Sequence, residues 1–287
     1  MSASNLRIDA HQHFWKIARG DYGWLTPELE GLYRDYLPVD LTPQIERAGI
    51  SGTVLVQAAP TLAETEFMLS LAARHNFIKG VVGWIDFDDP AALTQIENLS
   101  ENPALVGLRP MIQDIAEDDW MLGAHLTPLF QAMIDADLTF DALTLPRHLK
   151  NLRLLLARHP DLRVVIDHGS KPQIRKGKID DWATDMARLA RETSAYCKLS
   201  GLVTEASPTW STHDLRPYAD HLFKVFGPER LIWGSDWPVC TLAATYAEWV
   251  TATDDLLVGF DDDQKAGILG GNAVHAYKLQ KLDEGAN

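Results

Sequence analysis

Residues 163–168 read RVVIDH, a β-branched apolar run that ends on two polar side chains. Seven other short runs are also rich in Val, Ile and Leu, as buried parallel strands are. With this one, the eight runs are residues 6–11, 52–57, 80–85, 104–109, 138–142, 163–168, 195–200 and 230–235. A helix-like stretch, in places preceded by a loop, follows each run. Eight strands that alternate with helices predict an α/β fold, the (β/α)8 barrel of the TIM type.

A doubly wound open sheet is the competing arrangement. No GxGxxG motif follows the first run, and eight strands are the number that closes a barrel. The length of 287 residues suits one such barrel. No linker, low-complexity segment or longer repeat divides the chain. We therefore expect a single domain over residues 1–287.

The composition is that of an ordinary globular protein, with 46% hydrophobic and 23% charged residues. The net charge of −14 excludes a cationic face that binds nucleic acid. Residues 1–7 have no apolar stretch of a signal peptide, and no run approaches the roughly 18 apolar residues of a membrane span. Cys197 and Cys240 form no disulfide framework. We expect a soluble, cytoplasmic protein with reduced thiols, no nucleic-acid or membrane partner, and an oligomeric state that the sequence does not indicate.

The segment after the first predicted strand is extended and rich in aromatic residues. Residues 14–40 carry Phe14, Trp15, Tyr22, Trp24, Tyr33 and Tyr36. This density favours two roles together, a hydrophobic plug at one end of the barrel and a wall or lid over the active site. In this fold the active site lies at the C-terminal ends of the strands.

Polar side chains gather at those predicted strand ends, whereas the strand middles are aliphatic. In the sequence His11-Gln12-His13 the two imidazoles share one face of the strand, because alternate side chains point the same way. His168 and Asp236 end two further strands. Three imidazoles and one carboxylate suit Zn²⁺ or a similar divalent ion with one position open for water. The alternatives are a hydrogen-bonded strand-end role for His168 and a turn role for Asp236.

Five stretches carry a resemblance to a known family: IDAHQHFW at residues 8–15, DYGWL at 21–25, GLRP at 107–110, VIDH at 165–168 and IWGSDWP at 232–238. They resemble the amidohydrolase superfamily, of the amidohydrolase-2 type. Within it they resemble the branch of L-fuconolactonase- and L-rhamnono-lactonase-like proteins, related to the pyrone-dicarboxylate lactonases. The similarity extends over essentially the whole chain. The HxH motif and the last Asp are common to the superfamily, whereas WGSDWP and the aromatic first loop favour the lactonase branch.

The resemblance implies a hydrolase that opens a small sugar lactone, such as L-fucono- or L-rhamnono-lactone, to the sugar acid. Asp236 matches the proton-transfer Asp that activates water. His11, His13 and His168 match the imidazoles that bind one metal ion or, in metal-independent relatives, polarise the lactone carbonyl directly. The predicted catalytic residues are therefore Asp236 and His168, and the predicted metal ligands are His11, His13, His168 and Asp236.

The chain departs from the binuclear members of the superfamily, which use a carboxylated Lys and a further strand-end His. The corresponding strand ends here carry Arg109, Asp141 and Ser200. The expectation is therefore one divalent metal ion or metal-independent chemistry, and not a two-metal site.

Several polar and aromatic residues are predicted to contact the substrate. Arg109 matches a strand-end arginine that contacts substrate oxygens, and with Lys171 it would supply positive charge for a sugar-acid product. The tryptophans either stack on a pyranose face or pack at the barrel rim. The predicted substrate-binding residues are Trp24, Gln57, Trp84, Arg109, Asp141, Lys171 and Trp237.

Two other functions stay open from the sequence. A metal-dependent decarboxylase of the same superfamily would hold a similar His and Asp set around a tightly bound metal ion. A non-catalytic barrel would bind a sugar acid without turnover. A covalent acyl-enzyme route is disfavoured, because the chain has no Gly-x-Ser-x-Gly motif.

Overall fold

A computed structural model describes residues 6–279 of the chain. Residues 1–5 lie outside it. They are most of the segment, residues 1–7, on which the signal-peptide expectation depends. Eight strands form one parallel sheet in the order β1 to β8. They are β1 (Ile8–Gln12), β2 (Gly52–Val56), β3 (Ile78–Gly83), β4 (Leu105–Leu108), β5 (Thr139–Ala142), β6 (Val164–Ile166), β7 (Tyr196–Leu199) and β8 (Leu231–Trp233).

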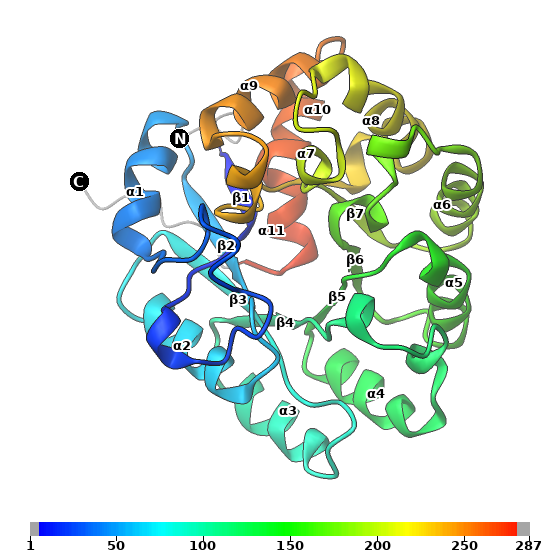
Figure 1. The fold of residues 1–287 in the computed structure, drawn as a ribbon. Coiled ribbons are helices and arrows are strands. Elements are labelled where there is room, and N and C mark those ends of the chain that lie inside the picture. The colour runs from blue at the N-terminus through cyan, green and yellow to red at the C-terminus, as the bar shows by residue number, and fades with distance from the viewer. Residues whose placement is uncertain (1–5, 280–287) are drawn as a thin grey trace.

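Most of the helices form a ring around the strands, whereas α11 lies within this ring in the view of Figure 1. They are α1 (Pro38–Arg47), α2 (Leu62–Ala72), α3 (Ala92–Ser100), α4 (Thr127–Asp135), α5 (Leu149–Arg158), α6 (Asp180–Glu192), α7 (Leu202–Glu205), α8 (Thr212–Phe226), α9 (Tyr246–Leu256), α10 (Asp262–Ala266) and α11 (Asn272–Ala276). The predicted (β/α)8 barrel is confirmed, and each predicted run contains all or most of one strand.

The chain just after β8 pairs with the end of β1 and closes the barrel. Gln12 forms a parallel bridge with Trp237. The amide of Asp236 donates to the carbonyl of His11, and the amide of His13 donates to the carbonyl of Trp237, both at 2.7 Å. Gly234 permits this approach, because a Cβ there would lie 2.7 Å from the Cβ of His11. The closure therefore brings the ends of β1 and β8 into direct contact.

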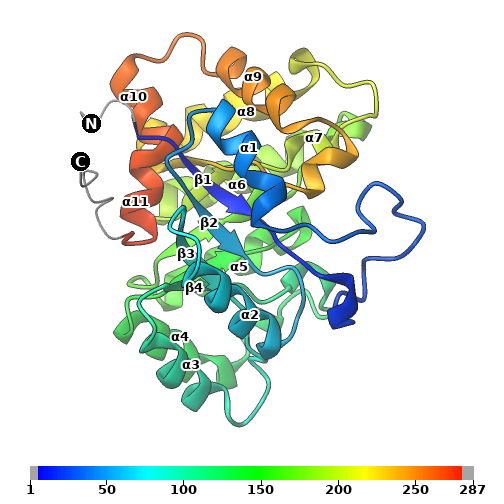
Figure 2. The same cartoon turned by 90° about the vertical axis from the view of Figure 1, so that its left-hand side faces the viewer.

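One apolar cluster joins residues of the strands to the C-terminal segment. It contains Ile8, Ala10, Val54, Val56, Val82, Val106, Val165 and Ile232 together with Ala273, Ala276, Tyr277 and Leu279. In Figure 2, α11 lies at the end opposite to that toward which the arrowheads of β1 and β2 point. The C-terminal segment therefore covers the N-terminal end of the barrel and leaves the other end to the loops that follow the strands.

The aromatic loop between β1 and α1 lies at the end of the barrel toward which the strands point (Figure 2). Trp15 and Tyr36 exchange two backbone hydrogen bonds, of 2.9 and 3.0 Å. The Trp15 ring packs against the rings of Tyr22, Trp24 and Tyr36. Tyr33 instead is exposed. Most of the loop is thus held as a packed aromatic cluster.

Two further expectations, reduced thiols and the lack of a membrane span, concern residues that the structure describes. Cys197 and Cys240 are both buried, unpaired thiols. Among residues 6–279, no helix combines the length and the apolar character that crossing a bilayer needs.

Candidate active site

Four side chains from three strand ends converge at the mouth of the barrel, as the sequence predicts. Oδ1 of Asp236 lies 3.3 Å from Nε2 of His13, 3.7 Å from Nε2 of His11 and 3.9 Å from Nε2 of His168. All four residues are buried, with at most 4% of their surface exposed. We call His11, His13, His168 and Asp236 the centre.

Local backbone geometry places these side chains. His168 closely follows β6 with a φ of 53°, and Asp236 follows β8 with a φ of 57°. Both values lie in the left-handed region that non-glycine residues rarely adopt and that clusters at functional sites. The pairing of β1 with β2 shifts register between Asp9 and Gln12, which indicates a bulge of the kind found beside active sites.

His168 is held by the two residues that follow β7, Ser200 and Gly201. Its Nδ1 lies 2.8 Å from Oγ of Ser200. Gly201 has a φ of 64°, and a Cβ there would lie 2.6 Å from the same Nδ1. Gly201 is therefore required both by its backbone conformation and by the space that the imidazole occupies.

His13 is held differently, by β2. Its Nδ1 lies 2.8 Å from the carbonyl oxygen of Val56, which accepts a hydrogen bond. Because a carbonyl oxygen can only accept, Nδ1 of His13 carries a proton and donates it. Its Nε2, which faces Asp236, is thus the nitrogen available to a ligand.

Burial sets the charge states of the centre. It lowers the pKa of His168 to about 4, despite the opposing effect of Asp236. Burial and the charge of Lys198 lower the pKa of His11 well below its usual value. Burial alone would raise the pKa of Asp236, but His168 and the hydrogen bond with His13 hold it below its usual value. Two neutral imidazoles, those of His11 and His168, therefore lie beside an ionised carboxylate.

A buried lysine lies beneath the centre, and the sequence reasoning missed it. Lys198, in β7, is fully buried. Its Nζ lies 2.6 Å from Oδ2 of Asp141, 2.9 Å from Oδ1 of Asp167 and 3.1 Å from Nδ1 of His11. The expectation that strand middles are aliphatic is wrong here. The available signal was a single charged residue in an otherwise apolar strand, which needs buried partners of opposite charge.

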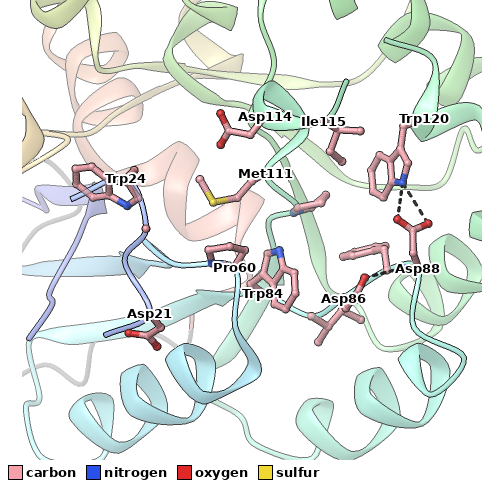
Figure 3. A pocket seen from close by; sticks show the side chains of 14 residues that line it. Asp21, Trp24, Pro60, Trp84, Asp86, Asp88, Met111, Asp114, Ile115 and Trp120 are labelled. Carbon is pink, nitrogen blue, oxygen red and sulfur yellow. Dashed lines mark hydrogen bonds between the residues drawn. The ribbon is translucent and has the colours of Figure 1, made fainter. Parts of the chain in front are cut away.

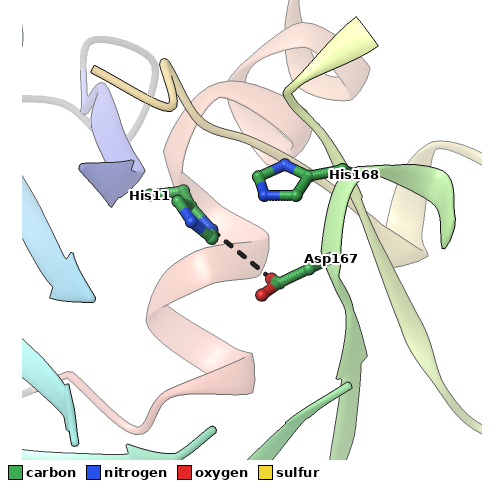
Figure 4. Close-up of side chains that lie close together, drawn as sticks. All are labelled: His11, Asp167 and His168. Atoms are coloured by element: carbon green, nitrogen blue, oxygen red, sulfur yellow. Dashed lines mark ion pairs between the residues drawn. The ribbon is translucent and has the colours of Figure 1, made fainter. Parts of the chain in front are cut away.

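Asp167 connects this lysine to the centre. Its Oδ1 lies 3.4 Å from Nδ1 of His11, the contact marked by the dashed line in Figure 4, and its Oδ2 accepts a hydrogen bond of 3.1 Å from Arg109. Burial would raise the pKa of Asp167, but Lys198, His11 and Arg109 hold it well below its usual value. Asp167 is thus a buried anion between two cations.

Three predicted substrate contacts belong to this buried network. The guanidinium of Arg109 contacts Asp167 and the carbonyl oxygen of Gln57, and the Gln57 amide donates to the carbonyl of Arg109 at 2.9 Å. Asp141 accepts from Lys198 and from the hydroxyl of Tyr277. Gln57 and Asp141 have no exposed surface, and Arg109 has 3%. The structure therefore places these three side chains against protein groups rather than in an open cavity.

Asp9 is the second buried charged residue, after Lys198, that the sequence reasoning missed. Its Oδ1 accepts from the amide of Ser235 at 2.8 Å and from the amide of His11 at 3.3 Å. Its Oδ2 accepts from the hydroxyl of Tyr246 at 3.0 Å. Asp9 therefore ties β1 to the residue that precedes Asp236.

A cavity of about 490 Å³ opens on the same face of the barrel, over the ends of β3 and β4 (Figure 3). Three tryptophans and four aspartates contribute to its wall. It is lined by Asp21, Gly23, Trp24, Pro60, Trp84, Ile85, Asp86, Phe87, Asp88, Pro110, Met111, Asp114, Ile115 and Trp120. Aromatic faces and carboxylate acceptors are groups that suit a polyhydroxylated ring.

Two of the seven predicted substrate contacts, Trp24 and Trp84, line this cavity, and the other five do not. Three of those five belong to the buried network described above, and the remaining two are Lys171 and Trp237. Lys171 is half-buried, and its Nζ donates to Oε1 of Gln113 at 2.8 Å. Trp237 is 4% exposed, and its ring packs edge-on against Phe14 and Tyr36. Of the two roles open for Trp237 from the sequence, its position is that of rim packing.

Short stretches of chain connect the cavity to the centre. Val56 accepts from His13, Ala58 accepts from the indole of Trp24 at 2.7 Å, and Pro60 lines the cavity. Similarly, Arg109 contacts His11 and is followed directly by the cavity-lining Pro110. The cavity and the centre are thus neighbours on one face.

The aromatic loop is fastened to α2 by a buried carboxylate. Oε2 of Glu64 accepts from the hydroxyl of Tyr22 at 2.7 Å. Arg19 donates to Asp21 at 2.6 Å, and Thr61 donates to the same carboxylate at 2.9 Å. Burial raises the pKa of Glu64 to about 7. These contacts hold Asp21 where it lines the cavity.

The centre fits a divalent metal ion by its donor atoms. Nitrogens of His11 and His13 and an oxygen of Asp236 lie within 4.8 Å of one another, and so do those of His11, Asp167 and His168. Imidazoles with one carboxylate are a donor set that suits Zn²⁺. Metal-binding histidines commonly donate their other ring N–H to a carboxylate, which orients the imidazole. Asp167 lies next to His11 in such a position.

The chain is similar to curated and solved proteins over nearly its whole length. It is 43% identical to an L-fucono-1,5-lactonase of Burkholderia ambifaria and 34% identical to an L-fucono-1,5-lactonase of Burkholderia multivorans, with 96% of each chain covered in both cases. A crystal structure of a Burkholderia multivorans amidohydrolase with bound zinc has a TM-score of 0.89 and 34% identity, and the match covers 96% of this chain and 100% of that one.

The sequence profile of the Amidohydrolase family matches residues 8–279, which include every residue of the centre and its buried network. The resemblance inferred from the HxH motif and the WGSDWP string is confirmed. The chain therefore belongs to the Amidohydrolase family.

Proposed function

We propose that this protein hydrolyses a neutral sugar lactone of the L-fucono-1,5-lactone type to the corresponding sugar acid. The proposal rests on the position of Asp236, whose Oδ1 faces the Nε2 atoms of three imidazoles at 3.3–3.9 Å. A carboxylate can take a proton from water, and imidazole N–H groups can stabilise an oxyanion. These are the two tasks of lactone hydrolysis. The names of the two Burkholderia relatives support the substrate class.

Asp236 acts as the general base. Its lowered pKa keeps the carboxylate ionised at neutral pH. As water attacks the carbonyl carbon of the lactone, Asp236 accepts a proton from that water, and the carbonyl oxygen becomes an oxyanion. A positioned base contributes about 10²–10⁴-fold to the rate.

His168 is the second catalytic residue of the proposal. Its pKa of about 4 keeps it neutral at pH 7, and with its ring proton on Nε2 it would donate a hydrogen bond to the oxyanion. When the oxyanion collapses, the bond from the carbonyl carbon to the ring oxygen breaks. The ring oxygen takes the proton held by Asp236, which leaves a hydroxyl and a carboxylic acid that then ionises.

A divalent ion is compatible with this centre. His11, His13, His168 and Asp236 would hold it, and when bound it would polarise the lactone carbonyl as a Lewis acid. The proton transfers described above are those of Asp236 in either case.

The cavity beside the centre would recognise the sugar ring. Trp24 and Trp84 offer aromatic faces to its C–H groups, and Asp86 and Asp114 offer acceptors to its hydroxyls. In this proposal Lys171 lies beside the cavity, where it donates to Gln113. The other predicted contacts support the centre and the cavity by binding protein groups: Gln57, Arg109, Asp141 and Trp237.

A pH-indicator screen of 1,4- and 1,5-aldonolactones tests the proposal, with metal-stripped and with Zn²⁺-supplemented protein. We expect opening of L-fucono-1,5-lactone above the spontaneous rate and a loss of about 10²–10⁴-fold in kcat in Asp236→Asn. Asp254→Asn, an exposed change on α9, is the matched control and should leave kcat unchanged. If no lactone is opened faster than in buffer, the proposal is wrong.

Assays of the wild-type protein and of Asp236→Asn separate the two alternative functions, a decarboxylase and a non-catalytic barrel. A decarboxylase would release carbon dioxide from aromatic or enoic acids and would open no lactone. A non-catalytic barrel would bind a sugar acid equally well in wild type and in Asp236→Asn, and neither protein would turn over a lactone.

A further inference from the structure

Nδ1 of His11 faces two protein groups of opposite hydrogen-bonding character. Nζ of Lys198 lies 3.1 Å away and Oδ1 of Asp167 lies 3.4 Å away. In a neutral imidazole one nitrogen carries the proton and the other accepts, and the partner of one nitrogen fixes the role of the other. Whichever group bonds to Nδ1 therefore decides what Nε2 presents to the centre.

The surroundings of Lys198 identify its role. The side chain is fully buried, and a buried ammonium persists only where anions compensate it. Two carboxylates do so, Asp141 at 2.6 Å and Asp167 at 2.9 Å. An ammonium has three protons and no lone pair. Its third neighbour, Nδ1 of His11, can therefore only accept from it.

We propose that Lys198 is a positioning residue that holds His11 with its ring proton on Nε2. The protonated nitrogen then lies 3.7 Å from Oδ1 of Asp236 and presents a donor to the centre. Arg109 also approaches this nitrogen, at 3.4 Å, while it donates to Asp167 at 3.1 Å. Of the two cations beside the ring, Lys198 is the nearer, at 3.1 Å from Nδ1, so we assign the lone pair to Nδ1. The inference deepens the proposed function, because this donor would stabilise the oxyanion of a lactone.

His13 has the opposite arrangement. Its Nδ1 donates to the carbonyl of Val56 and must therefore carry a proton. The Nδ1 atoms of the two imidazoles of the HxH motif thus have opposite roles, an acceptor in His11 and a donor in His13. The motif is symmetric in sequence, and its chemical asymmetry comes from the neighbours Lys198 and Val56.

Asp167 defines the competing arrangement. If Nδ1 of His11 donated to Oδ1 of Asp167, Nε2 would present a lone pair, as a metal ligand requires. The distances of 3.1 Å to Lys198 and 3.4 Å to Asp167 favour Lys198. Metal binding through Nε2 of His11 would therefore require the ring proton to move.

Long-range ¹H–¹⁵N spectra of the metal-stripped protein labelled with [¹⁵N]histidine test the inference, because protonated and unprotonated ring nitrogens have well-separated shifts. The signals of His11 are those that disappear in His11→Gln. We expect an unprotonated Nδ1 and a protonated Nε2. A protonated Nδ1 in the wild-type protein would overturn the inference. The spectrum involves no turnover, so a failure of the lactonase proposal would leave this result standing.

Lys198→Met supplies the second measurement. In this variant we expect the His11 signals to shift toward a protonated Nδ1, paired with Asp167, and kcat to fall about 10²-fold with KM nearly unchanged. Lys79→Met, a lysine of β3, is the matched control and should change neither. A folded Lys198→Met protein with the wild-type His11 spectrum would contradict the inference. If the variant does not fold, the wild-type spectrum still decides.

Discussion

The centre and the cavity share one face of the barrel but differ in how their side chains are held. In the centre, His168 and Asp236 are at most 4% exposed, and both contact other buried protein groups. In the cavity, Trp24 and Trp84 are half-buried, and Asp86 and Asp114 are exposed. The difference teaches that the side chains of the centre are fixed at strand ends, whereas the side chains of the cavity lie on loops and are more exposed; under the proposed function, the first would react and the second would recognise the substrate.

The division also has an electrostatic side. Two buried cations, Arg109 and Lys198, lie beside the centre, and the lining of the cavity contains four aspartates. The positive charge expected for the substrate site is thus located below the reacting groups. A neutral lactone ring suits the cavity better than its anionic product does.

The largest loss of turnover among three changes outside the centre is expected from Gly201→Ala. The new Cβ would lie 2.6 Å from Nδ1 of His168, at a φ of 64°. A displacement of His168 of this kind costs about 10²-fold in kcat. Steady-state kinetics with an aldonolactone measure it.

Gly177→Ala provides the control for Gly201→Ala. Gly177 has a φ of 62°, and no other group lies within 4 Å of the place that an alanine Cβ would occupy there. Both variants suffer the backbone strain of alanine at positive φ, but only Gly201→Ala should lose kcat. Equal kcat values in the two variants would show that His168 is not displaced.

A smaller effect, on KM rather than kcat, is expected from Trp84→Ala. Removing one indole face from the cavity should raise KM about tenfold, which corresponds to about 1.4 kcal/mol, with kcat little changed. Trp210→Ala is the control, because this indole donates to the carbonyl of Ala243 and does not line the cavity. A fall in kcat with constant KM would place Trp84 with the reacting groups.

The smallest effect on turnover is expected from Glu64→Gln, which instead changes how stability depends on pH. Burial raises the pKa of Glu64 from 4.5 to about 7. Between these values the folded protein keeps a proton that the unfolded chain releases, so the free energy of unfolding falls as pH rises, by about 3 kcal/mol in total. The variant should lack this decline.

Urea unfolding of Glu64→Gln and wild type at pH 4.5, 6 and 8 measures the difference. The amide can still accept from Tyr22, so the aromatic loop should stay in place and KM should change little. If the two proteins lose stability in parallel over this range, Glu64 does not titrate as described.

The fold and the four residues of the centre could be predicted because each leaves a local signal. Six of the eight apolar runs end on a polar residue, and His11, His13, His168 and Asp236 lie at such ends or within two residues after them. The sequence does not indicate which way a strand-end side chain turns. Arg109 and Trp237 are at strand ends too, yet their side chains contact protein groups.

The partners of Lys198 and Asp9 could not be predicted for a related reason. Each lies within a strand and depends on partners far along the chain: Lys198 contacts Asp141, 57 residues away, and Asp9 bonds to Ser235, 226 residues away. Only the closed barrel brings such pairs together. The single domain over residues 1–287 and the roles of the substrate-contacting residues remain predictions.

The hydroxyl of Tyr277 donates to Asp141 at 2.8 Å. Asp141 holds Lys198, which in turn contacts His11, so the support of the site begins near one end of the described chain and finishes near the other. During synthesis the N-terminal part leaves the ribosome first. The complete set of contacts that supports His11 can therefore form only after Tyr277 has left the ribosome. A product that ends before Tyr277 lacks the complete arrangement.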